Sequence, residues 1–193
     1  LKINLEKGRK ALENKLDSHH LNLRRKLAEK FLSTWVGNFH EGYARVAKGR
    51  FFFFVDSSGN KLLNELYTLA QDFSDGLALV EKDGKFNYID RAGTKISTED
   101  FDFADDFFEG LAAVKNNKQW YYIDKTGKEI SRERYDTADS FSNGLARVMK
   151  NGRCFFINKS GKKNSQISYN SAQSFSDGLA RIHMSGGFYF IDK

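Results

Sequence analysis

The chain of 193 residues contains no proline, one cysteine and no long apolar run. A lone thiol, Cys154, can neither form an intramolecular disulfide nor supply a thiolate zinc site by itself. The longest apolar stretch, Phe51 to Val55, is far shorter than the roughly 18 residues that a membrane-spanning helix needs. The sequence also lacks an initiator methionine and a signal peptide, so we expect a soluble fragment or processed chain of unknown compartment.

Apolar and aromatic residues are abundant instead. Hydrophobic residues make up 40% of the chain, charged residues 29% and aromatic residues 15%. This balance is typical of a folded protein, and together with the lack of proline it excludes a collagen-like, low-complexity or wholly disordered chain.

The sequence repeats itself with a fixed period of 34 residues. A Phe-x-x-Gly motif, followed by x-Ala-x-Val or x-Ala-x-Ile, begins at Phe39, Phe73, Phe107, Phe141 and Phe175. An aliphatic residue and an Asp or Asn follow on the same spacing at residues 55–56, 89–90, 123–124, 157–158 and 191–192. Five copies without an insertion predict a tandem repeat protein.

The pattern within each copy indicates β-hairpins. A period of 34 also occurs in tetratricopeptide helix pairs, but here glycines or turn residues interrupt the chain every eight to twelve residues. Asn151-Gly152 and Asp83-Gly84 each join two short apolar runs, and such pairs tolerate the positive φ angles of a two-residue hairpin turn. We therefore predict tandem 34-residue units, each a three-stranded antiparallel β-meander too small to fold alone.

Alternation along the strands predicts which side chains are buried. The columns that begin with Ala44 and Val46 scarcely vary between copies, so we expect them to face the core. The interleaved position varies freely and is expected to meet solvent; it is occupied by Arg45, Leu79, Ala113, Arg147 and Arg181. The second strand is apolar on both faces and should be buried on both.

Turns and a third strand should complete each unit. Asp56, Asp90, Asp124 and Asn158 each begin an Asp-x-x-Gly or Asn-x-x-Gly turn. A third strand is expected to follow, for example over residues 94–96. The spacing of Tyr67, Ala70 and Phe73 indicates a helical turn in the connection to the next copy.

These units are expected to form an open superhelical array, with a closed ring as the alternative. The predicted copies cover residues 39–193, as 39–66 (partial), 67–100, 101–134, 135–168 and 169–193 (partial). Residues 1–38 carry no repeat column. Apolar positions three or four apart indicate a helical segment there, either a cap on the first unit or a linker; they are Leu12, Leu16, Leu23, Leu27, Phe31 and Trp35.

The repeats resemble the WG repeat family, whose units read approximately Phe-x-x-Gly-Leu-Ala-x-Val, a hairpin, then Lys-Trp-Gly-Tyr-Ile-Asp-x-x-Gly. The resemblance covers Phe39 to Lys193. Other residues replace the Trp-Gly pair, including Phe86-Asn87 and Trp120-Tyr121, and the family's third-strand proline is missing. The resemblance implies a divergent member of a mainly bacterial family of interaction scaffolds with no common catalytic residues.

A second resemblance is to choline-binding and glucan-binding cell-wall repeats. The segment 119–127, which contains Trp120, Tyr121 and Tyr122, is similar to their Trp-Tyr-Tyr hairpin. Those units are nearer 20 residues long and carry a further set of aromatics. This resemblance implies a glycan-binding or cell-wall-binding module as the alternative function.

No pattern indicates catalysis or a cofactor. His40 and His183 occupy different columns, and the adjacent His19 and His20 would point to different faces of a helix, so neither pair predicts a metal site. The acidic columns tolerate Asn and lack the dense ladder of a calcium loop, which favours turn formation. We expect Cys154 to be a small buried hydrophobe.

The sequence therefore predicts a binding protein. We predict that another protein contacts Arg45, Arg147, Arg181, Trp120 and Tyr121. Nucleic acid is not favoured, because the positive charge is concentrated outside the repeats: residues 1–38 hold nine Lys/Arg and four Asp/Glu, whereas residues 39–193 hold 22 and 21.

Overall fold

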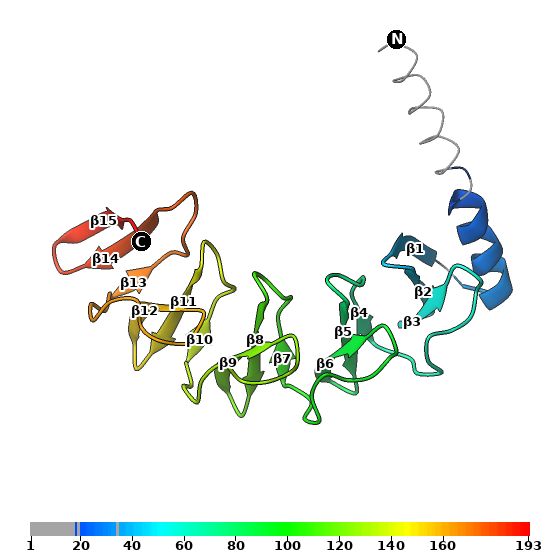
Figure 1. Cartoon of the computed structure of the whole chain (residues 1–193), viewed down its shortest axis with the longest axis horizontal. Helices are drawn as coiled ribbons and strands as arrows, with labels where there is room; N and C mark the ends of the chain where they lie inside the picture. Colours follow the sequence, from blue (N-terminus) through cyan, green and yellow to red (C-terminus); the bar gives the residue numbers. More distant parts are fainter. Residues whose placement is uncertain (1–17, 19, 34) are drawn as a thin grey trace, which may run out of the picture. The chain divides into compact units, whose positions relative to one another are not determined.

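The computed structural model describes residues 18, 20–33 and 35–193 (Figure 1). This part of the chain is mainly β, with one helix at residues 20–31 followed by five three-stranded antiparallel sheets. The prediction of tandem three-stranded antiparallel repeats behind an N-terminal helix is confirmed. The chain divides into two compact units: the described residues up to Asp83 with Ile89–Thr94, and Gly84–Tyr88 with Lys95–Lys193.

The helix and the first strands belong to the first unit. Its first sheet contains β1 (Trp35–His40), β2 (Tyr43–Lys48) and β3 (Phe51–Asp56). The next sheet has β4 (Leu69–Ala70), β5 (Leu77–Lys82) and β6 (Lys85–Asp90), in that order. The division between the two units falls within β6.

The second unit contains three complete sheets with the same strand order. The first has β7 (Phe103–Ala104), β8 (Leu111–Asn116) and β9 (Gln119–Asp124). The second has β10 (Thr137–Ala138), β11 (Leu145–Lys150) and β12 (Arg153–Asn158). The third has β13 (Ser171–Ala172), β14 (Ala180–Met184) and β15 (Gly187–Ile191).

The hairpin turns form where the sequence predicts them. Asn151 and Gly152, between β11 and β12, have φ angles of 53° and 71°, as a type I′ turn requires. The Phe-x-x-Gly motif contains a second turn of this kind, which the pattern analysis missed: Asn143 and Gly144 have φ angles of 56° and 82°. The signal was present, because Asn-Gly and Asp-Gly also occur inside that motif.

The third strand of each sheet lies before the hairpin, as β1, β4, β7, β10 or β13. Residues 94–96 form only an isolated bridge, with main-chain hydrogen bonds from Asp90 to Thr94 and from Ile96 to Tyr88, so the prediction of a regular strand there is wrong. The prediction of a helical turn from Tyr67 to Phe73 is also wrong. Phe52 and Tyr67 exchange two main-chain hydrogen bonds of 2.8 and 2.9 Å, and this pairing holds the segment extended.

The Asp-x-x-Gly turns form as predicted. Asp124 Oδ1 accepts the N–H of Thr126 at 2.8 Å and of Lys128 at 3.1 Å. Gly127 follows in the left-handed region, with φ 81°. Asn158 makes the same pair of bonds to Ser160 and Lys162, which explains why this column tolerates Asn.

Aromatic columns interlock successive copies. Tyr122, on one sheet of the second unit, packs against Tyr135, Phe141, Val148 and Ile157 from the next copy. The Tyr122 and Phe141 ring centroids are 5.0 Å apart in an edge-to-face contact. The Ala44 and Val46 columns are buried in every copy, so the predicted inward face is confirmed.

The N-terminal helix packs on the first sheet. Leu27 is buried against Phe53 and Val55, and the rings of Phe31 and Phe53 lie 5.2 Å apart. Trp35 does not continue the helical stripe, because it begins β1. Leu12 and Leu16 lie outside the described residues. Among the described residues, the structure contains no helix with the length and apolar character needed to cross a bilayer.

Candidate functional site

Two of the predicted partner-binding arginines are engaged within the protein. Arg45 Nε lies 2.6 Å from Asp72 Oδ1, and Arg147 donates to both carboxylate oxygens of Asp139 at 2.6 and 2.8 Å. Hydrogen bonding to Asp139 raises the pKa of the Arg147 guanidinium. Both arginines are only half-exposed, so each is held in one orientation.

Two further members of this column depart from the predicted exposure. Leu79 and Ala113 are buried, so the expectation that they meet solvent is wrong. Ala113 is buried because it belongs to the core cluster that contains Tyr122, Tyr135 and Phe141. Arg181 is exposed, and its guanidinium lies 4.2 Å from the centre of the Phe188 ring.

The two predicted aromatics have different environments. Tyr121 is 6% exposed, and the Arg134 guanidinium lies 4.1 Å from the centre of its ring, so it offers little surface to a partner. Trp120 lies on the other face of β9 and is half-exposed. Trp120 therefore remains accessible to a partner.

Trp120 belongs to a row of three aromatic side chains in the second unit, Phe86, Phe103 and Trp120, which we name the aromatic stripe. The ring centroids of Phe86 and Phe103 are 5.3 Å apart, and those of Phe103 and Trp120 are 5.5 Å apart. Phe103 is 43% exposed, and the other two rings are half-exposed. The stripe is thus an apolar surface that solvent reaches.

Main-chain pairing creates the aromatic stripe. Phe86 and Phe101 exchange main-chain hydrogen bonds of 2.8 and 2.9 Å, which places Phe103, two residues later, next to Phe86. Across the sheet, Phe103 pairs with Lys115, and Lys115 pairs with Trp120. In the other copies the Phe103 position holds Trp35, Leu69, Thr137 or Ser171. The ring contacts of the described residues form this three-ring row in one place, around Phe103.

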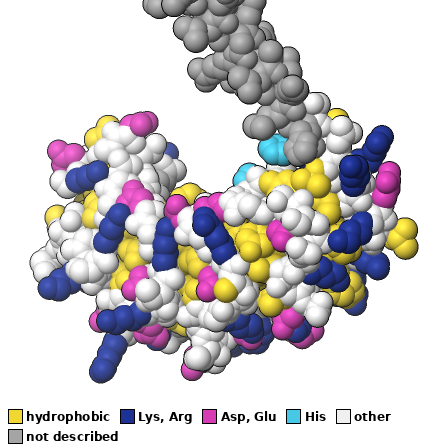
Figure 2. Space-filling view, turned by 45° about the vertical axis from the view of Figure 1, so that its right-hand side comes forward, with side chains coloured by type: hydrophobic (Ala, Val, Ile, Leu, Met, Phe, Trp, Pro, Cys, Tyr) yellow, Lys and Arg dark blue, Asp and Glu magenta, His cyan; other side chains and the backbone are white. Residues whose placement is uncertain are grey.

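Charged groups flank the aromatic stripe. Lys115 Nζ lies 5.6 Å from the centre of the Trp120 ring, within the range of a cation–π contact. Lys85 forms an ion pair with Asp102, and its hydrogen bond is the main cause that lowers the pKa of that carboxyl. Figure 2 shows hydrophobic side chains lying between charged ones across the surface.

One acidic column links consecutive copies. Glu109 accepts the Gly144 N–H at 3.0 Å and lies 3.1 Å from Lys159 Nζ. Glu41 does the same with Gly76 and Arg91 in the first unit. Within residues 18, 20–33 and 35–193, the structure contains no group of three His, Cys, Asp or Glu side chains placed to hold a metal ion.

The Glu109 link predicts a pH dependence of stability. A hydrogen bond from Lys159 lowers the pKa of the Glu109 carboxyl in the folded protein. The stability that this carboxylate contributes is therefore present above its unfolded-state pKa and is lost as pH falls through its folded-state pKa. We expect E109Q to lower the free energy of unfolding by less than about 1 kcal/mol at pH 7, because the ion pair is partly exposed. The loss should be smaller at pH 3. Urea unfolding at both pH values measures this; E99Q, which changes another exposed carboxylate, is the control. An equal loss at both pH values would contradict the link.

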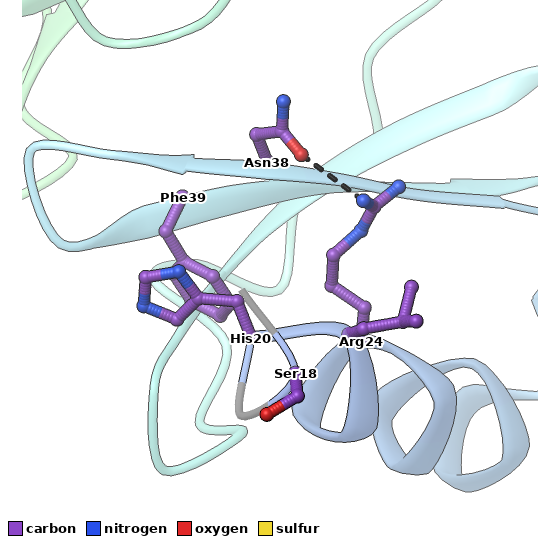
Figure 3. A pocket seen from close by; sticks show the side chains of 6 residues that line it. Ser18, His20, Arg24, Asn38 and Phe39 are labelled. Atoms are coloured by element: carbon purple, nitrogen blue, oxygen red, sulfur yellow. Dashed lines mark hydrogen bonds between the residues drawn. The ribbon is translucent and has the colours of Figure 1, made fainter. Parts of the chain in front are cut away.

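A hollow of about 440 Å³ lies between the N-terminal helix and β1 (Figure 3). Arg24 reaches across it and donates to the Val36 carbonyl at 2.6 and 2.8 Å and to Asn38 Oδ1 at 3.0 Å. Its guanidinium thereby covers the edge of β1, which would otherwise be open to another strand. We assign the Arg24 bridge across this hollow a structural role.

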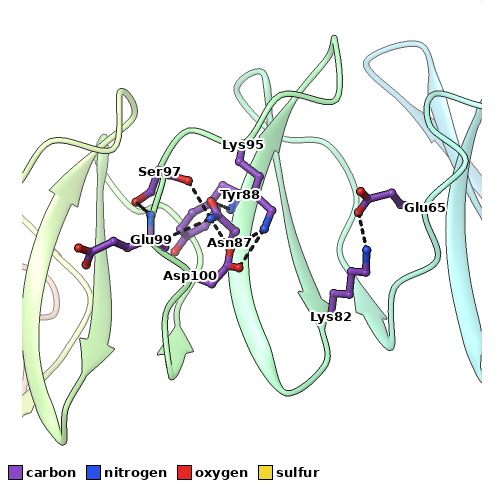
Figure 4. A network of polar contacts seen from close by, with 8 residues as sticks. All are labelled: Glu65, Lys82, Asn87, Tyr88, Lys95, Ser97, Glu99 and Asp100. Carbon is purple, nitrogen blue, oxygen red and sulfur yellow. Dashed lines mark hydrogen bonds and ion pairs between the residues drawn. The ribbon is translucent and has the colours of Figure 1, made fainter.

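Asn87 forms a buried polar network that the pattern analysis missed (Figure 4). It is 2% exposed, and its Nδ2 donates to the Ser97 carbonyl at 3.1 Å and to Asp100 Oδ1 at 2.8 Å. Lys95 pairs with the same carboxylate at 2.7 Å. Every polar atom of the Asn87 side chain has a partner, so the network fixes the loop and offers no open ligand position.

Comparison with known proteins identifies the repeats. The sequence matches the family described as WG containing repeat over residues 52–86, 88–120, 122–154 and 155–187. A comparison with curated proteins gave no match.

Solved structures share part of the arrangement at low identity. Kluyveromyces lactis Hsv2p matches with a TM-score of 0.45 and 8% identity, over 81% of this chain and 60% of that one. PorZ of Porphyromonas gingivalis matches with a TM-score of 0.40 and 12% identity, over 81% of this chain and 24% of that one. This chain therefore spans less than two thirds of either neighbour.

Proposed function

The chain belongs to the WG containing repeat family, and from this premise we propose that it is a non-catalytic scaffold that binds another protein through the aromatic stripe. The observation that carries the proposal is the exposure of Phe103 beside Phe86 and Trp120. Exposed aromatic clusters are common at protein interfaces, where such rings supply much of the binding energy.

The aromatic stripe borders the packing that holds the copies together, because Trp120 packs against the core cluster that contains Tyr122 and Phe141. Those core rings are almost fully buried, whereas the stripe keeps ring surface that solvent reaches. A partner can contact this exposed ring surface beside the core. Of the arginines that the sequence predicts as partner contacts, Arg181 is the exposed one, whereas Arg45 and Arg147 already bind carboxylates.

Glycan binding is the alternative function, supported by the exposed Trp120 and its Trp-Tyr-Tyr segment. Sugars stack on open, flat ring faces, but Phe103 and Trp120 are inclined at 68° to each other, and Lys115 lies over the Trp120 ring. This geometry favours a protein. Titration with cell-wall polysaccharides, followed by tryptophan fluorescence, tests the alternative; saturable binding of a glycan would favour it.

We expect F103S to lose the protein that the intact chain captures. The immobilised intact chain and the variant are exposed to extract from cells that express the gene, and bound proteins are quantified by mass spectrometry. F108S is the matched control, because Phe108 is also exposed and lies toward the opposite end of β8. A captured protein that F108S retains and F103S loses supports the proposal; equal capture by both would refute it.

A further inference from the structure

Lys118 adopts a left-handed conformation beside the aromatic stripe. The turn between β8 and β9 consists of Asn117 and Lys118, with φ angles of 50° and 68°. In three other copies glycine occupies the Lys118 position, as Gly84, Gly152 or Gly186. A left-handed conformation is unfavourable for a residue with a Cβ, and strained residues of this kind concentrate at functional sites.

Positive charge at this end of the strands is only partly balanced. Among the described residues, no carboxylate lies within ion-pair distance of Lys115, Lys118 or Arg153. After the hydrogen bond from Lys85, which already pairs with Asp102, the charge of Lys115 also helps to lower the pKa of the Asp102 carboxyl. Arg153, in the hairpin of the next copy, donates to the Asn170 side chain and to the Ser168 carbonyl, which are both uncharged. Lys118 and Arg153, with Lys115 beside them, are thus available to an acidic partner.

The carboxylates nearby are already engaged. Asp102 pairs with Lys85 and accepts the Asn117 N–H at 2.9 Å. Glu133 pairs with Lys150 at 2.7 Å, and Asp136 accepts the Asn151 N–H at 2.7 Å. The surface therefore combines apolar rings with cations that form no ion pair within the described residues, and a segment with acidic and apolar side chains complements both.

We propose that the aromatic stripe, together with Lys115 and Lys118, binds an acidic peptide segment of the partner protein that carries a large apolar side chain. This inference rests on the proposed function and names the partner's chemistry. The apolar side chain packs on Phe103 and Trp120, and the carboxylates pair with the two lysines. Because the pairs are exposed, salt weakens the binding.

A labelled peptide of ten Glu and Asp residues around a central Leu-Phe pair tests this, with binding followed by fluorescence anisotropy. We expect K118G to weaken binding at least fivefold while its urea unfolding midpoint rises, because glycine relieves the strained turn. K128Q, at the other end of β9, is the control and should bind like the intact chain. Replacing Leu-Phe by Ala-Ala in the peptide should weaken binding at least tenfold.

Three results would overturn the inference: equal binding by K118G, equal binding of a peptide with Lys in place of the acidic residues, or tighter binding of oligouridylate than of the acidic peptide. The proposed function is tested separately. If the peptide does not bind but F103S still loses the captured protein, the acidic-segment inference fails and the scaffold function stands. If F103S retains the captured protein, the scaffold function fails.

Discussion

Replacing Gly127 by alanine is expected to destabilise the second unit by about 2–5 kcal/mol. A Cβ at this position would lie 2.2 Å from the Ile96 carbonyl oxygen and 2.9 Å from its carbon. Both atoms belong to the main chain, so they cannot move aside as a flexible side chain can. Gly127 also has φ 81°, which adds the cost of a left-handed alanine. Urea unfolding of G127A, followed by circular dichroism, measures the loss.

Gly144 supplies the matched control. Its φ angle is 82°, nearly that of Gly127, but a Cβ there would have no atom within 4 Å. G144A should therefore show only the conformational cost of about 1–2 kcal/mol. Equal losses for G127A and G144A would mean that the close approach to Ile96 does not exist in solution.

Y122A is expected to lower the free energy of unfolding by about 3–5 kcal/mol, the usual loss when a large core aromatic is truncated. The Tyr122 ring is 2% exposed and packs against Tyr135 and Phe141. Its hydroxyl also donates to the Asp139 carbonyl at 2.6 Å, and truncation removes that partner. Calorimetric or urea unfolding measures the change.

Phe190 occupies the same repeat column as Tyr122 but is 72% exposed. F190A should therefore change the stability by less than about 0.5 kcal/mol. The comparison separates the effect of burial between copies from the effect of residue type. If F190A costs as much as Y122A, the aromatic columns do not stabilise the protein by interlocking consecutive copies.

Local chemistry made much of the fold predictable. Asn151-Gly152 specifies its own turn, and the alternation around Ala44 and Val46 identifies the inward face without knowledge of neighbouring copies. The third strand was not predictable in this way. It forms because Tyr67 pairs with the main chain of Phe52 in the preceding copy, and the two-residue strand β4 carries no alternation of its own.

The candidate site was harder to predict, because it depends on contacts between columns. Arg45 occupies a variable position, which favours exposure, but it pairs with Asp72, 27 residues away and in another column. Trp120 is identified by the Trp-Tyr-Tyr segment in which it lies. Phe103 carries a weaker signal, because its position holds Trp35 in the first copy and Leu, Thr or Ser in the others. Its contact with Phe86 depends on the pairing of Phe86 with Phe101.

The central claim is that the aromatic stripe binds a protein partner. The most direct measurement is the dissociation constant of the captured protein, once purified, for the intact chain, F103S and F108S. The account predicts that F103S weakens binding by at least 30-fold, about 2 kcal/mol, as expected for a hot-spot residue, while F108S binds like the intact chain. Equal affinity for F103S and the intact chain, with both folded, would contradict it.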